Sequence, residues 1–374
     1  MNIFTKGKKT QKDSDGVVSL PLSNLRKPVR KELIYELLLE SGIVVQLFPG
    51  CAFDGVSFAG SDLTGLLLSG SDFKNCDFSS CNLSWTDFSN CNLYGTKFDN
   101  SLLDRTVLVD SQLSNSSLEN VRGKNTRFDG ADVSFCVITG SLIDSDFSQT
   151  KIVSSTFKNL DLSSATFLQS TVIGTSFHDC NLRDCIFIET GLVCGRFEAC
   201  MMAKILFLGA TLTKIDFINL RSSRPRWDFQ AATLEDVVFD HCDLDCSDFA
   251  GSSLTRITFE HSQLYGSDFS GACLTNVQFL GTGVNDSKFC DSTWVNCTAV
   301  LSRFRRGDFG NASISDTSIS RSVIHEAQLE DASCFNLTFT DCMFDQANSW
   351  PRDFSIPANK ISLHGPDFIS EDGK

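Results

Sequence analysis

The chain has 374 residues, 41% of them hydrophobic, and a formal net charge of -14 at pH 7. The charge is uneven, because residues 1–31 hold eight basic and two acidic residues whereas residues 51–346 hold 21 basic and 37 acidic residues. An acidic surface repels nucleic acid and attracts basic protein partners, so no direct binding to DNA or RNA is expected. No run approaches about 18 apolar residues, which argues against a membrane-spanning helix. The N-terminal residues lack the apolar stretch of a secretory signal peptide, so export by that route is not expected.

The N-terminal region divides into two predicted segments. Residues 1–27 are polar, rich in Lys and Ser and without hydrophobic periodicity, which predicts a disordered basic leader. Residues 28–50 begin with PVRKELIYELLLESG, where Pro28 suits a first helical turn, three leucines share one face and Gly42 suits the end. This pattern predicts an amphipathic helix and lead-in that cap the next element. The alternative is a docking helix, so a monomer and an end-to-end dimer through this helix both remain open.

Residues 51–346 carry an apolar residue at every fifth position, a period that belongs neither to a helix nor to an ordinary strand. Such a period indicates a repeat architecture. The register runs from Phe53 to Ile143, from Phe147 to Phe217 and from Phe229 to Phe344, and only Gly123 lacks an apolar side chain. Its clearest stretch is formed by Phe239, Leu244, Phe249, Leu254, Phe259, Leu264, Phe269, Leu274 and Phe279.

The order of Phe and aliphatic residues predicts the shape of one coil. From residue 147 to residue 217, Phe recurs every ten positions with Ile, Leu, Val or Met between. Because Phe occupies every second unit, Phe stacks on Phe in successive coils only if each coil has an even number of sides. Two sides leave no room for Phe, and six leave an interior too wide to fill at protein packing density. Four sides, or twenty residues per coil, therefore remain, with coils about 4.8 Å apart. The predicted internal columns are Phe229, Phe249, Phe269, Phe289 and Phe309, and beside them Leu234, Leu254, Leu274, Trp294 and Ile314.

This pattern resembles the pentapeptide-repeat family, whose unit is a small residue, often Asp or Asn, then Leu or Phe, then two freer residues. The resemblance implies an all-β fold, a right-handed quadrilateral parallel β-helix, here with a short N-terminal capping helix. Residues 347–374 break the pattern with three prolines and are predicted to form an irregular C-terminal cap and tail.

Sixteen cysteines raise the possibility of disulfides or zinc, but their positions favour a packing role. Eleven of them stand two residues before a central residue, at a small inward position, where Cys acts as an apolar filler. Cys180 and Cys200 lie one coil apart and could approach each other, yet the lack of a signal peptide favours reduced thiols. The eleven are Cys51, Cys76, Cys81, Cys91, Cys136, Cys180, Cys185, Cys200, Cys242, Cys297 and Cys342.

Two irregularities interrupt the repeat. The spacing contracts to four between Ile143 and Phe147, which predicts a local kink. It expands to twelve between Phe217 and Phe229, which predicts an insert at residues 218–228. Loops that break a regular scaffold often carry function. The insert is therefore either a partner contact with an exposed Trp or a tolerated insertion with the Trp tucked against the coil. The candidate contact residues are Arg221, Arg224, Arg226 and Trp227, with a second basic group, Arg303, Arg305 and Arg306, that is either a contact or a solvated corner.

No catalytic or phosphate-binding signature is present, so neither an enzyme nor a cofactor is predicted. His241 and His261 are twenty residues apart and are expected to stack, with Asp240 and Glu260 beside them. Imidazole and carboxylate groups can hold a metal ion. A solvent-facing ladder is the more common outcome, and no metal is predicted. Asp248, Asp268, Lys288 and Asp308 are expected to form an acidic surface column.

The sequence therefore predicts a non-catalytic, protein-binding rod. The resemblance implies two classes of role, a type III secreted effector that binds a host protein and a DNA mimic that protects a bacterial type II topoisomerase. The first is favoured, because the polar leader and the repeats that fill the rest are typical of pentapeptide-repeat effectors. The expected location is the bacterial cytoplasm, with secretion into a host cell under the effector hypothesis.

Overall fold

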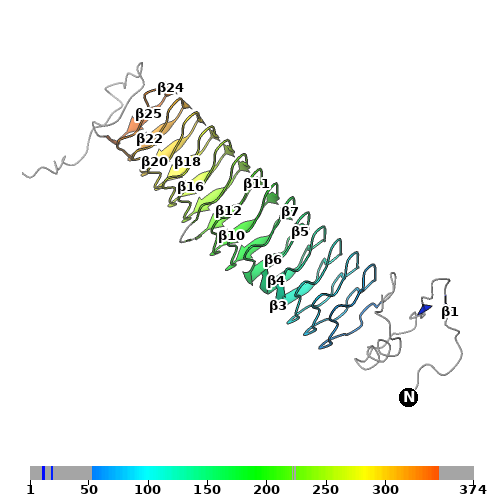
Figure 1. The fold of residues 1–374 in the computed structure, drawn as a ribbon. Helices are drawn as coiled ribbons and strands as arrows, with labels where there is room; N and C mark the ends of the chain where they lie inside the picture. The colour runs from blue at the N-terminus through cyan, green and yellow to red at the C-terminus, as the bar shows by residue number, and fades with distance from the viewer. Residues whose placement is uncertain (1–10, 13–17, 20–52, 221, 223–224, 345–374) are drawn as a thin grey trace, which may run out of the picture.

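The structure is a computed structural model that describes residues 11–12, 18–19, 53–220, 222 and 225–344. Residues 53–344, apart from the gaps in this range, form one elongated β-solenoid (Figure 1). The all-β prediction is confirmed for the described residues, which contain no helix. The predicted capping helix at 28–50, the tail at 347–374 and most of the leader at 1–27 lie outside the described residues. Within the leader, β1 (Gln11–Lys12) pairs antiparallel with β2 (Val18–Ser19).

Each coil has four faces, which we number in chain order. The first face is a ten-stranded parallel sheet and the second a twelve-stranded parallel sheet. The third and fourth faces are held mainly by isolated parallel bridges, together with the pair β23 (Val323–Ile324) and β26 (Met343–Phe344). The first face consists of β5 (Lys151–Val153), β7 (Thr171–Ile173), β9 (Gly191–Val193), β11 (Thr211–Thr213), β13 (Thr233–Glu235), β15 (Ser253–Thr255), β17 (Cys273–Thr275), β19 (Thr293–Val295), β21 (Ser313–Ser315) and β24 (Ser333–Phe335). The second face consists of β3 (Ser117–Lys124), β4 (Val137–Ile143), β6 (Thr156–Asp161), β8 (Ser176–His178), β10 (Arg196–Glu198), β12 (Asp216–Ile218), β14 (Val238–Asp240), β16 (Thr258–Glu260), β18 (Gln278–Leu280), β20 (Thr298–Val300), β22 (Ser318–Ser320) and β25 (Thr338–Thr340).

The strand register confirms the predicted coil of twenty residues. Phe239 pairs with Phe259 on the second face, and Leu254 pairs with Leu274 on the first. The predicted aromatic column is also confirmed, because the rings of Phe249 and Phe269 stack with centroids 4.6 Å apart and planes 1° from parallel. Phe259, on the opposite face, meets Phe249 edge to face at 6.0 Å. Stacking along a column and edge contacts between columns fill the interior with aromatic carbon.

The small residue two positions before each central residue also points inward. Thr106 Oγ1 donates to the carbonyl of Leu83 at 2.8 Å, one coil away, and Ser287 Oγ donates to that of Leu264 at 2.7 Å. Cys185 uses its thiol in the same way toward Leu162, which confirms the packing role of cysteine at this position. The ten described cysteines predicted to be inward are buried, and Cys51 lies outside the described residues.

Burial also sets the chemistry of these thiols. It raises the pKa of Cys91 to about 12, so the thiol form persists at neutral pH. Cys180 and Cys200 are free thiols, and the hydrogen bond between their side chains raises the pKa of Cys200. Thiolates are the reactive form of cysteine, so such buried groups are inert packing elements.

The second residue after each central residue turns the corner with a left-handed backbone. Glycine, Asn and Asp tolerate positive φ, which explains their frequency here. Leu301 adopts φ 56° and is 60% exposed. Its backbone is therefore strained, and burial of its side chain does little to offset that strain.

Leu301→Asn is therefore expected to raise the free energy of unfolding by about 0.5–1 kcal/mol, because it relieves left-handed strain. Chemical denaturation of the full chain measures the change. The same substitution at Leu208, which is not among the positive-φ residues, should bring no such gain. Equal effects at both positions would contradict the strain argument.

The coil that is one residue short lies at a different point of the chain from the one predicted. Leu142, fully buried, is the central residue of its unit, whereas Ile143 is only partly buried. The contraction to four therefore falls between Ile138 and Leu142, and the predicted contraction between Ile143 and Phe147 is wrong. The register shifts on β4 between Ile138 and Gly140, and Gly140 has φ 111°. This coil is one residue shorter than its neighbours, and the irregular strand pairing at the glycine accommodates the difference.

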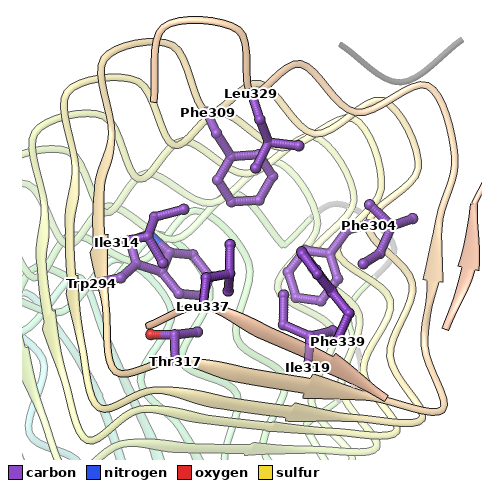
Figure 2. A pocket seen from close by; sticks show the side chains of 10 residues that line it. Trp294, Phe304, Phe309, Ile314, Thr317, Ile319, Leu329, Leu337 and Phe339 are labelled. Atoms are coloured by element: carbon purple, nitrogen blue, oxygen red, sulfur yellow. The ribbon is translucent and has the colours of Figure 1, made fainter. Parts of the chain in front are cut away.

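The C-terminal end of the interior contains a small apolar cavity of about 20 Å³ (Figure 2). Its lining includes Trp294, Phe304, Phe309, Ile319, Leu337 and Phe339. Such a volume has room for about one water molecule but offers it almost no polar partner. It is a packing gap and is too small for a substrate.

Candidate functional site

Trp227, for which an exposed contact and a position tucked against the coil both remained open, lies inside the solenoid. Its side chain is 1% exposed, and Nε1 donates a hydrogen bond to the carbonyl oxygen of Met202 at 2.9 Å. The contact interpretation of this residue is therefore wrong. Arg221 and Arg224 lie outside the described residues, while Arg226 is exposed at φ 40°.

The two extra residues of the insert explain why a tryptophan is needed. Trp227 stands two positions before the central residue Phe229, where the neighbouring coils carry the smaller side chains of Cys185, Ile205 and Ser247. Its indole packs against the rings of Phe217 and Phe239, at 5.4 and 6.4 Å between centroids. It therefore supplies core volume at the point where the repeat register is broken. Backbone hydrogen bonding between coils continues at the insert, where Lys204 N–H donates to the carbonyl oxygen of Pro225 at 2.7 Å.

The second basic group, Arg303, Arg305 and Arg306, lies on an exposed corner of the third face. Arg305 contacts Glu326 at 3.1 Å, and Arg306 binds Asp286 through two nitrogen atoms. The Arg306 hydrogen bonds lower the pKa of Asp286. These two guanidinium groups therefore neutralise acidic side chains of neighbouring coils, whereas Arg303 makes no ion pair with the described residues.

The acidic surface column exists as predicted. Asp248, Asp268, Lys288 and Asp308 bridge one another on consecutive coils of the fourth face. Each of the three aspartates accepts a hydrogen bond from the backbone N–H two residues later, at 2.9–3.0 Å. Asp at this position thus stabilises its own turn. Much of the acidic character of the rod has this local structural cause.

An apolar patch on the fourth face was missed by the sequence reasoning. On three consecutive coils, the outward residues on each side of the central Phe are apolar, apart from one threonine. Leu168 is 36% exposed and Leu208 is 39% exposed, and the other three apolar members are partly buried. The patch is formed by Leu168, Ile186, Ile188, Leu206 and Leu208. The signal was present as IFI and LFL at positions twenty apart, where many other coils of this face have an Asp before the central residue.

Acidic residues border this apolar patch. Asp146 and Asp228 occupy the fourth face before and after it, in register with Thr166 and Leu206 respectively. Glu189 lies at the corner beside Ile188 and accepts a hydrogen bond from Gln169 at 2.7 Å. Acidic groups thus border the exposed hydrocarbon at Asp146, Asp228 and Glu189, while Lys204 at the opposite corner pairs with Asp184 at 3.7 Å. Contiguous exposed apolar surface commonly marks an interaction site.

The predicted stacking of His241 on His261 is confirmed, with ring centroids 4.9 Å apart. Asp240 and Glu260 are paired across the second face, as expected. Asp240, His241 and His261 form a cluster of potential metal ligands in the described part of the chain. As for membranes, none of the described residues belongs to a helix with the length and hydropathy that a crossing requires.

Two family models match the chain. A model described as "Pentapeptide repeat region" matches residues 71–145, and one described as "Pentapeptide repeats (8 copies)" matches residues 51–90, 228–260 and 242–279. No curated protein matches the sequence significantly.

Solved structures with similarity to the chain include HetL, a pentapeptide repeat protein involved in heterocyst differentiation regulation in the cyanobacterium Nostoc sp. It is 15% identical, with a TM-score of 0.22 over 71% of this chain and 92% of HetL. A pentapeptide repeat protein from the Arabidopsis thaliana thylakoid lumen is 20% identical, with a TM-score of 0.21 over 26% of this chain and 61% of that protein. Full-length QnrB1, a plasmid-mediated fluoroquinolone resistance protein, is 17% identical, with a TM-score of 0.21 over 44% of this chain and 93% of QnrB1.

Proposed function

Because the chain belongs to the pentapeptide-repeat family, we propose that it is a non-catalytic rod whose outer surface binds another protein. The observation that carries this proposal is the apolar patch with its acidic rim on the fourth face. In the described residues, the apolar gap of about 20 Å³ inside the rod is too small to admit a substrate. A solenoid binds partners along its regular outer faces, where consecutive coils repeat the same positions.

The chemistry of the patch defines the partner. Leu and Ile side chains at its centre favour an apolar strand or helix face, because burying apolar surface contributes roughly 25 cal/mol per Å². Asp146, Asp228 and Glu189 at the rim favour Lys or Arg on the partner, and this charge pattern increases the rate of association and selects the orientation. We therefore propose a protein segment with a central apolar stretch and basic flanks.

Leu208→Glu is expected to weaken capture of the partner about tenfold or more, because it places a charge in the centre of the apolar contact. The measurement is affinity capture from bacterial and host lysates with the unaltered rod and the variant as paired baits. Leu102→Glu is the matched control, since Leu102 is also 39% exposed but lies on the third face, away from the patch. If both variants lose the same proteins, or neither does, the patch is not the contact surface.

The same capture experiment separates the two finer proposals. A host protein retained by the unaltered rod and lost with Leu208→Glu supports the secreted-effector proposal. Gyrase or topoisomerase IV retained in the same way supports the DNA-mimic alternative. We favour the first, because an apolar patch has no counterpart on the phosphate-lined surface of duplex DNA. Type III export remains a separate proposal, measured by delivery of a reporter fused to residues 1–30.

A further inference from the structure

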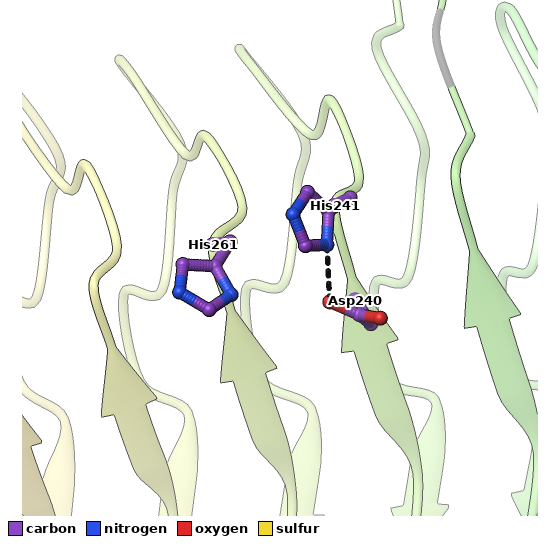
Figure 3. A group of neighbouring side chains, drawn as sticks. All are labelled: Asp240, His241 and His261. Carbon is purple, nitrogen blue, oxygen red and sulfur yellow. Dashed lines mark hydrogen bonds and ion pairs between the residues drawn. The ribbon is translucent and has the colours of Figure 1, made fainter.

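Two histidines and a carboxylate converge at one corner of the second face. Asp240 ends β14 and Glu260 ends β16, and these residues are direct neighbours in the parallel register. His241 and His261 follow them with φ 53° and 48°, so both chains turn the corner in the same left-handed conformation. The repeat thus places the two imidazoles on consecutive coils at equivalent positions, with their planes tilted by 33° (Figure 3).

The donor atoms of this corner lie within the range of one ion. One ligand atom from each of Asp240, His241 and His261 lies within 4.8 Å of the other two. His241 Nδ1 is 2.5 Å from Asp240 Oδ1. Donors bound to one zinc ion at 2.0–2.2 Å are about 3–3.5 Å apart. Because the histidine side chains are 51% and 56% exposed, small rotations can close the remaining distance.

Neighbouring residues complete the arrangement. Glu260 Oε1 lies 3.7 Å from His261 Nδ1, so it offers either a fourth donor or an acceptor that orients the ring. On the next coil the equivalent position is Gly281, where an added Cβ would come within 3.2 Å of His261 Cδ2. Glycine there leaves room for the imidazole. On the preceding coil the equivalent residue is Asn219, also left-handed.

We propose that Asp240, His241 and His261 form a surface site for a divalent transition-metal ion of the Zn²⁺ class, with Glu260 as supporting ligand. Two neutral imidazoles and a carboxylate suit Zn²⁺ and Ni²⁺ better than Mg²⁺ or Ca²⁺, which prefer all-oxygen sites. The exposed side leaves coordination positions for water. Because the ligands come from two coils, the bound ion ties these coils together and stabilises the folded rod.

The test is calorimetric titration of the full chain at neutral pH with Zn²⁺ and, separately, Ni²⁺. The unaltered protein should bind about one equivalent at this site, and His241→Asn and His261→Asn should each weaken that binding at least ~10-fold. Asparagine is suitable because Asn219 adopts the same backbone at the equivalent position. His178→Asn is the control, since His178 lies on the same face outside the cluster.

A second measurement, the unfolding temperature, distinguishes this site from metal binding by cysteine thiols, which none of these variants alters. The metal should raise the unfolding temperature of the unaltered protein and of His178→Asn but not that of the two cluster variants. Metal binding that is equal in all four proteins, or absent from the unaltered protein, would overturn the proposal.

Discussion

Trp227→Ala is expected to lower the free energy of unfolding by about 3–5 kcal/mol, the usual cost of removing a large aromatic side chain from a core. Two effects add in the same direction, the loss of packing and the loss of one buried hydrogen bond. The substitution leaves a cavity between the rings of Phe217 and Phe239, and it removes the donor to the Met202 carbonyl. The cost of the lost hydrogen bond is that of leaving this buried carbonyl without its side-chain partner. Denaturant titration of the full chain measures the loss.

Trp85→Ala is the matched control for this prediction. Trp85 is 56% exposed, and the Arg105 guanidinium lies over its ring at 4.3 Å. Removing an exposed cation–π contact costs about 0.5–1 kcal/mol. A further variant, Trp227→Phe, keeps most of the volume and loses only the N–H donor, so its cost should lie between the two. If Trp227→Ala costs no more than Trp85→Ala, Trp227 is not a core residue.

The five-residue period was sufficient to predict the solenoid, the coil length and the internal columns. It works because every coil repeats the same environment, so an apolar residue at a central position has only one place to go. The columns that contain Phe249 and Leu254 follow from this rule alone. The cysteine assignment follows as well, since the inward position before each centre is buried and is most often filled by a small side chain such as Ser, Thr, Ala or Cys.

The same period failed where the repeat changes length. Ile143 fits the apolar pattern as well as Leu142, and only the bulge at Gly140 shows which of them faces inward. For Trp227 the sequence left an exposed and a tucked position open, because it follows Arg226 in a basic segment and the period is broken there. The apolar patch was missed for another reason. Its residues are seen to share a face only when the outward positions are also aligned every twenty residues. The five-residue period marks only the inward positions.

Gly140→Ala should be among the most damaging single substitutions, with an expected loss of about 3 kcal/mol or more in the free energy of unfolding. Gly140 has φ 111°, and an added Cβ would lie 2.2 Å from the Val121 carbonyl oxygen and 2.9 Å from the Val121 nitrogen. Both are backbone atoms of a fully buried residue that pairs with Gly140 across β3 and β4. Neither strand can retreat without breaking the ladder on which the shortened coil depends.

Gly65→Ala separates steric collision from backbone strain in this test. Gly65 also has positive φ, +71°, but no atom lies within 4 Å of an added Cβ. The control should therefore cost only about 1 kcal/mol, the ordinary penalty of a left-handed alanine. Because each coil contacts mainly its neighbours, hydrogen exchange in Gly140→Ala should increase around β3 and β4 and change little at β16 and β18. Equal losses for the two variants would mean that the close approach at Val121 relaxes freely, and the bulge would then not be the fixed point of the shortened coil.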